Sequence, residues 1–171
     1  MNNPGPIALR AVEDALLVVG THEKGNTNSG KEVNQYLASV GLNPGNPWCL
    51  AFVIFRLKRA ASELAAHLPV GMPLNTGYTP DMANWAQSNH LWLPATGHDA
   101  KRGDLAFFWI HAENRIGHVG FVTDRWSGGV ITVEGNTSPS PGVTPNGGGV
   151  YVKQHTWANL GEGGGFMRIS V

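Results

Sequence analysis

The sequence changes character at Pro94, and this change limits the folds that the chain can adopt. Before Pro94, apolar residues recur at helical spacing over residues 7–19, 31–40 and from 49 to about 67. Thr79-Pro80-Asp81 predicts the start of a fourth helix, with a capping hydroxyl, a proline at the first position and an early acid. The first half of the chain is therefore predicted to be helical.

The second half has the pattern of strands. Residues 104–110, 118–124, 130–134, 150–154 and 166–171 form short apolar runs separated by Gly, Asn or Pro turns. Helices followed by neighbouring strands predict an α+β fold, with N-terminal helices packed on an antiparallel β-sheet of about five to six strands. The 171 residues fit a single domain over residues 1–171 with one core. Residues 137–149 are expected to be a mobile loop or the rim of a cleft.

Composition excludes several classes of partner. With 12 basic and 12 acidic residues, the chain has no charge excess to attract nucleic acid or an acidic membrane surface. Charged residues interrupt the longest apolar stretch, residues 50–68, so no membrane span is expected. Residues 1–6 lack the pattern of a secretion signal, so we expect synthesis in the cytoplasm. A monomer is expected. The single cysteine excludes an internal disulfide, and no metal or cofactor is expected.

That cysteine, Cys49, stands at the predicted start of the longest helix. The positive end of the helix dipole favours a thiolate there, and the free N–H groups of the first turn can hold a developing oxyanion. A small buried core cysteine fits the same position equally well. Position alone therefore leaves both interpretations open.

A general base for Cys49 is sought among seven histidines. His118 opens an apolar strand between Gly117 and Gly120, and glycines allow another chain segment to approach closely. His111, in the predicted hairpin connection, is the alternative. His155 follows a strand without a nearby acid and is set aside.

A third group is needed to orient the imidazole of His118. Glu134 and Asn136 end the next predicted strand, which hairpin pairing brings beside His118. A carboxylate there would fix the imidazole tautomer and stabilise a thiolate–imidazolium pair. Asn136 could take this role instead or bind substrate. Taken alone, each also fits a surface position, as a solvent-exposed acid or a turn residue.

Four segments, PWCLAFV (47–53), RGDLAFF (102–108), GHVGFV (117–122) and VEGNT (133–137), resemble in order the motifs of the CHAP family. The name stands for cysteine, histidine-dependent amidohydrolase/peptidase, a branch of the NlpC-like, papain-related hydrolases. The resemblance covers about residues 20–155. It implies a papain-like fold with Cys49 as nucleophile, His118 as base and acid, and Glu134 as the orienting residue, with Asn136 close by.

The resemblance implies bacterial peptidoglycan as the substrate. The reaction would cleave an amide bond through a cysteine acyl-enzyme, as a stem-peptide endopeptidase or an N-acetylmuramoyl-L-alanine amidase. Asn46 is a candidate second oxyanion donor, and Trp48, Tyr78 and Trp109 are candidate walls of the substrate cleft. Some family members bind calcium through an acidic loop before the cysteine, but residues 41–48 contain no acid, so no such site is expected.

The biological setting is left with alternatives. A phage-type lysin would reach the wall or periplasm through a holin, and a secreted antibacterial effector through secretion machinery. For an effector, a cognate immunity protein is expected as a partner. The alternative functions are a catalytically inactive wall-binding module and a cysteine protease or deamidase that acts on proteins.

Overall fold

A six-stranded sheet forms the centre of the computed structural model, in the order β1-β6-β2-β3-β4-β5 with antiparallel neighbours throughout. The model describes residues 3–171; Met1 and Asn2, the start of the segment searched for a secretion signal, lie outside it. The strands are β1 Trp92–Pro94, β2 Leu105–Ile110, β3 Arg115–Trp126, β4 Gly129–Thr137, β5 Gly149–Thr156 and β6 Gly165–Met167. The predicted α+β fold and strand number are confirmed.

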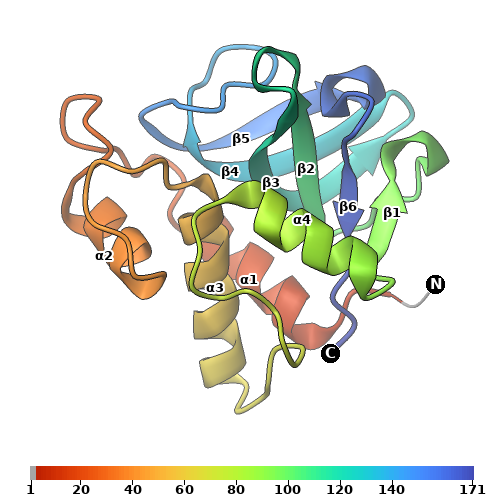
Figure 1. The fold of residues 1–171 in the computed structure, drawn as a ribbon, viewed down its shortest axis with the longest axis horizontal. Helices are drawn as coiled ribbons and strands as arrows, with labels where there is room; N and C mark the ends of the chain where they lie inside the picture. Colours follow the sequence, from red (N-terminus) through yellow and green to blue (C-terminus); the bar gives the residue numbers. More distant parts are fainter. Residues whose placement is uncertain (1–2) are drawn as a thin grey trace.

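Helices precede the sheet in the chain and pack against it (Figure 1). They are α1 Pro6–Leu16, α2 Lys31–Ser39, α3 Cys49–Glu63 and α4 Thr79–Ser88, with short 3-10 turns η1 Ala95–Gly97, η2 His111–Glu113 and η3 Trp157–Leu160. α1, α3 and α4 contact the sheet, and α2 packs on α3. α3 ends earlier than predicted, and Ala65 just beyond it takes a left-handed φ of 49°. Among the described residues, no helix is both long and apolar enough to cross a lipid bilayer.

The central strand β2 is buried on both faces. Leu105 and Phe107 belong to the larger apolar cluster, which joins the helices to one face of the sheet. Ala106 and Phe108 belong to a smaller cluster that includes Leu160 of η3. This alternation follows from the two-residue period of a strand. It explains why β2 is a continuous apolar run.

Beside the smaller cluster, β3, β4 and β5 carry buried polar side chains. They include His118, Thr132, Glu134, Lys153 and His155. Ring contacts of Phe108 with His118 and His155 show that these groups share its face of the sheet. The sheet thus has an apolar face toward the helices and a partly polar, buried opposite face.

The start of α4 differs from its prediction. Thr79 is the first residue of the helix rather than its cap, and Tyr78 at the cap position makes no side-chain capping bond. The Thr79 hydroxyl instead donates a hydrogen bond to the carbonyl oxygen of Ile116 at 2.8 Å. This buried bond ties α4 to β3 directly before Gly117 and His118.

Candidate active site

Cys49 is the first residue of α3, as the sequence predicted. The N–H of Phe52 donates to the carbonyl of Trp48 at 2.9 Å, closing the first helical turn. The N–H groups of Cys49 and Leu50 therefore have no partner within the helix. The Cys49 side chain is 3% exposed, so it contacts solvent only at the floor of a cleft.

Strand β4 passes directly against the first turn of α3 at Gly135. A Cβ atom at Gly135 would lie 2.7 Å from Cγ of Phe52 and 2.8 Å from the ring of Trp48. Only glycine permits this approach without displacing the helix. The contact carries Glu134 and Asn136, its chain neighbours, to the end of α3 where Cys49 lies.

His118 and Glu134 form a fully buried pair. The Nε2 atom of His118 lies 2.8 Å from Oε2 of Glu134, and both side chains are 0% exposed. The other ring nitrogen, Nδ1, makes no hydrogen bond of ordinary geometry with a described residue. Burial lowers the pKa of His118, but interactions with Cys49 and Glu134 outweigh it and raise this pKa to about 9. An imidazolium is therefore favoured at neutral pH.

Glu134 is held ionised by its hydrogen bonds. Burial alone would raise the pKa of this carboxyl, but the bonds from His118 and His155 outweigh it and hold the pKa well below its usual range. Its Oε1 atom lies 2.6 Å from Nε2 of His155 and accepts a bond from the Thr132 hydroxyl at 2.5 Å. The carboxylate is thus charged and fixed on both oxygens.

Asn136 is buried beside this pair but does not join it. Its backbone has a left-handed φ of 57°, and its carbonyl accepts a bond from the N–H of Gly147 at 2.9 Å. Neither side-chain polar atom has a partner among residues 3–171. The geometry therefore favours Glu134 as the group that orients His118, a choice the sequence left open. Asn136 stays a candidate for binding a substrate group.

Gly120 makes the room that Glu134 occupies. A Cβ atom there would lie 2.5 Å from Cγ of Glu134 and 2.9 Å from the carbonyl oxygen of Val133. We expect Gly120→Ala to push the carboxylate away from His118 and to lower the free energy of unfolding by about 1–3 kcal/mol. Denaturant unfolding measures the effect. Gly97→Ala is the matched control, because a Cβ there meets no atom within 4 Å. Equal stability of the two variants would contradict the prediction.

A cleft of about 370 Å³ opens beside Cys49. Its walls come from the segment before α3, the segment before α4 and the start of β3. It is lined by Leu42, Asn46, Pro47, Cys49, Asn75, Thr76, Gly77, Tyr78, Thr79, Arg115 and Gly117. Asn46 and Tyr78 thus lie where the sequence suggested, with Tyr78 51% exposed. The Asn46 side-chain amide donates one bond, to the carbonyl of Asn43 at 2.9 Å.

Two tryptophans proposed as cleft walls lie elsewhere. Trp48 is 0% exposed, and its ring packs with Tyr36 and Phe52 while its Nε1 donates to Glu23 at 3.3 Å. The Trp48 ring turns into the core beside α2, and Trp48 is not among the described residues that line the cleft. Trp109 is half-buried, covers the chain at Gly163, and is not among the described residues that line the cleft.

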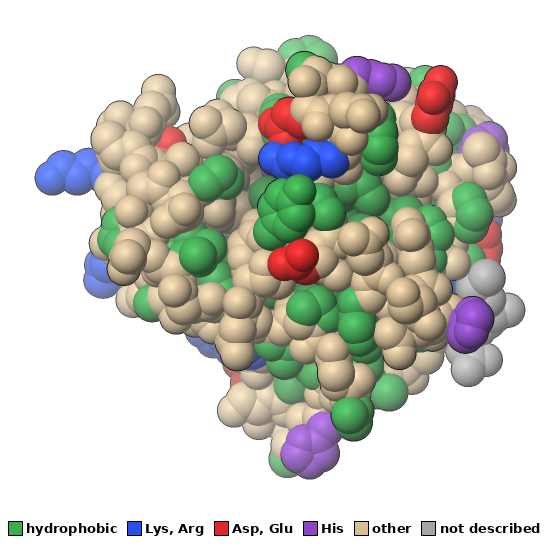
Figure 2. Space-filling model, viewed as in Figure 1, with side chains coloured by type: hydrophobic (Ala, Val, Ile, Leu, Met, Phe, Trp, Pro, Cys, Tyr) green, Lys and Arg blue, Asp and Glu red, His purple; other side chains and the backbone are tan. Residues whose placement is uncertain are grey.

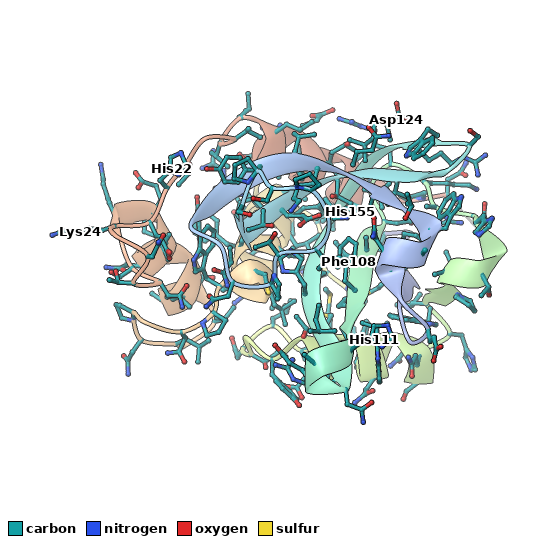
Figure 3. The ribbon with its side chains drawn as sticks, turned by 90° about the horizontal axis from the view of Figure 1, so that it is seen from above. His22, Lys24, Phe108, His111, Asp124 and His155 are labelled. Atoms are coloured by element: carbon teal, nitrogen blue, oxygen red, sulfur yellow. The ribbon has the colours of Figure 1, made fainter. Side chains whose placement is uncertain are left out.

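Sequence reasoning missed Arg115, which lines the cleft. Its guanidinium lies 5.2 Å from the centre of the Tyr78 ring, pairs with Glu113 and donates to the carbonyl of Ile116 at 2.9 Å. The residue directly precedes the apolar part of β3, and nothing local marked it. It places a guanidinium, paired with Glu113, on the wall of the cleft. His111, the alternative base, is exposed on η2 and lines a different hollow (Figure 3).

His155, set aside as a base because no acid lies near it in the sequence, does have an acid beside it in the structure. It lies on β5, is 0% exposed and contacts the carboxylate of Glu134. The predicted strand ended one residue short of it, at Gln154, so its pairing with Val130 of β4 was not considered. Figure 3 shows His155 beside Phe108, away from the exposed His111.

Surface charge and possible metal ligands point to no further functional site on the part of the chain that the structure describes. On the face shown in Figure 2, charged side chains are scattered and neither sign forms a continuous patch. Within residues 3–171, no group of three or more His, Cys, Asp or Glu side chains is arranged to hold a metal ion. What the site offers chemically is a thiol, an imidazole and a carboxylate beside free backbone N–H groups.

Comparison with known protein families matches residues 41–136, more than half of the chain, to the CHAP domain. The matched segment contains Cys49, His118, Glu134 and Asn136 and ends before β5. No curated protein and no solved structure gave a significant match. CHAP domains are in general amidases and peptidases that act on peptidoglycan. The chain therefore belongs to the CHAP domain family and has the α+β, papain-like fold expected of it.

Proposed function

We propose that the protein hydrolyses an amide bond of bacterial peptidoglycan through an acyl-enzyme on Cys49. The observation that carries the proposal is the buried His118–Glu134 pair, which interacts with a cysteine on the floor of a cleft. Membership of the CHAP family supports peptidoglycan as the substrate class. The thiol, base and orienting acid are the parts that cysteine-dependent acyl transfer needs.

The reaction proceeds in two halves. The Cys49 thiolate attacks the amide carbonyl, and the N–H groups at the start of α3 hold the oxyanion, with Asn46 as a further donor on the cleft wall. The His118 imidazolium protonates the leaving amine, the C–N bond breaks and an acyl thioester remains. His118 then takes a proton from water as the hydroxide attacks the thioester, the carboxylic acid leaves, and the Cys49 thiolate and the His118 imidazolium are restored.

Digestion of purified sacculi identifies the bond. Release of fragments with new amino and carboxyl ends within the stem peptide would show an endopeptidase. Release of intact stem peptides, with free lactyl groups on the glycan, would show an N-acetylmuramoyl-L-alanine amidase. Cleavage of added proteins with no fragment from sacculi would replace the proposal by a protein-directed protease.

Hydrolytic activity is expected to fall on the basic side of its pH profile. His118 must be protonated to donate to the leaving amine, so activity is retained below its pKa and lost as the pH rises through about 9. Because Glu134 raises this pKa, Glu134→Gln should move the basic limb to lower pH. We also expect kcat to fall roughly 100- to 10,000-fold, less than on removal of the base. The measurement is kcat/KM across the pH range for both proteins.

Glu162→Gln provides the matched control, since Glu162 is exposed on the segment after η3. It should keep the wild-type profile. If Glu134→Gln retains full activity and the same basic limb, the orienting role passes to Asn136.

We propose further that the reaction takes place at the cell wall after delivery by a phage holin or by secretion machinery. Expression in a bacterium with and without an export signal tests the setting. Lysis only with the signal supports it, whereas toxicity of the unexported chain would point to a cytoplasmic protein target.

A further inference from the structure

Glu134 is shared between two histidines, and the second has no part in the proposed reaction. His118 contacts Oε2, whereas His155 contacts Oε1 at 2.6 Å, and both imidazoles are 0% exposed. His155 lies beyond residues 41–136, the segment that the family match covers. We propose that His155 is a positioning residue: it donates to Glu134 and so keeps the carboxylate ionised and aimed at His118.

The hydrogen-bond inventory fixes the direction of this bond. An ionised carboxylate only accepts, so His155 donates its Nε2–H. Thr132 donates to the same oxygen at 2.5 Å. The Nδ1 atom of His155 has no hydrogen-bond partner among the described residues. The bond from Nε2–H to Glu134 is therefore the one hydrogen bond that the ring makes with them. With Oε1 occupied by two donors, Oε2 of Glu134 is left to His118.

Removal of the His155 donor should shift the pKa of Glu134 in a predictable direction. Burial is the strongest influence on the Glu134 carboxyl and favours the neutral form, which the bonds from His118 and His155 oppose. Without His155, the pKa of Glu134 moves upward. A protonated Glu134 no longer stabilises the imidazolium of His118, and the thiolate of Cys49 loses its counter-charge.

Other groups from the neighbouring elements also face Glu134 and the two histidines. Lys153 on β5 contributes a positive charge that interacts with Glu134, and its Nζ lies 3.3 Å from the hydroxyl of Thr144. Phe108 on β2 packs against the rings of both histidines, with centroid distances of 4.6 Å to His155 and 5.8 Å to His118. From α3, Cys49 acts through His118.

The inference rests on the proposed function only for the pairing of Cys49 with His118. Alkylation of Cys49 by iodoacetamide tests it without any substrate, because the thiolate is the reacting species. His155→Gln keeps an N–H donor close to the position of Nε2, whereas His155→Leu fills similar space without a donor. His67→Leu, at an exposed histidine, is the matched control.

In wild type, His155→Gln and His67→Leu, the rate of Cys49 alkylation should fall over the same pH range on the acid side. In His155→Leu this acid limb should move to higher pH by about one unit or more, and alkylation near pH 6 should slow roughly 10- to 100-fold. Hydrolysis should show the same shift, with a lower kcat and an unchanged KM.

An acid limb of His155→Leu that matches wild type overturns the inference, as does a shift in His155→Gln as large as that in His155→Leu. If His155→Leu does not fold, His155→Gln decides alone: a wild-type profile supports the donor role and a shifted one overturns it. Failure of the proposed function looks different, because wild-type Cys49 would then react no faster than a free cysteine at acidic pH.

Discussion

Cys49→Ala is expected to abolish hydrolysis of purified sacculi, lowering kcat roughly a million-fold. The acyl-enzyme cannot form without the sulfur, and no other cysteine exists to replace it. The fold should remain intact, because alanine is smaller than the 3% exposed thiol and suits a helix start. Release of soluble fragments from sacculi measures the loss, and circular dichroism and thermal unfolding verify the fold.

Cys49→Ser is the stricter companion variant, because it keeps a nucleophile of similar size that is far less reactive. It should be nearly as inactive as Cys49→Ala. An undiminished rate in either variant would remove Cys49 from the mechanism.

His118→Ala is expected to be inactive to a similar degree. In a catalytic unit of this kind, removal of any one essential member abolishes nearly all activity. The thiol then has no base and the leaving amine no acid. Removing the ring also leaves Oε2 of the buried Glu134 without its partner, which destabilises the protein. His118→Gln therefore accompanies it: the amide N–H can still donate to Glu134, but it cannot carry the proton. Hydrolysis and thermal unfolding are measured for both.

His111→Ala is the control for the choice of base. His111 is exposed on η2, and its variant should hydrolyse sacculi at the wild-type rate. If His111→Ala is inactive and the His118 variants are active, the base has been assigned to the wrong histidine.

The pairing of His118 with Glu134 was accessible from the sequence because it is local in the sheet. β3 and β4 are successive antiparallel strands, so hairpin pairing brings them side by side, although a bulge between Val122 and Asp124 shifts their register. The glycine at position 120 signalled a close approach, and the structure shows that the approaching group is Glu134 itself. Cys49 was accessible for the same reason, since a helix start is marked by its neighbours in the chain.

The part of the site on β5 was not accessible, because hydrophobicity predicts the wrong face. Val152 is 46% exposed, whereas Lys153 is 5% exposed and His155 is fully buried. The rule that apolar side chains of a strand face the core would bury Val152. The rule fails because a buried carboxylate and hydroxyl groups on β4 and the loop after it attract the polar side of β5.

The direction in which side chains near the cleft point was the second feature that could not be predicted from the sequence. Trp48 and Tyr78 both seemed able to contact substrate, but one ring turns into the core and the other stays 51% exposed. Arg115 reaches Tyr78 from another element. Such contacts depend on how α4 and β3 are brought together by the bond from Thr79, which sequence spacing does not encode.

The network around Glu134 draws its members from α3 and three strands, and each of its two carboxylate–imidazole pairs joins two different strands. Contacts between distant parts of the chain form only as the native topology closes. An unfolded or loosened chain therefore carries an ordinary thiol with no imidazolium beside it. Under the proposed function, catalytic activity is expected to be lost whenever the fold is lost, and a chain still being synthesised, or threaded unfolded through a pore, would not cleave amide bonds.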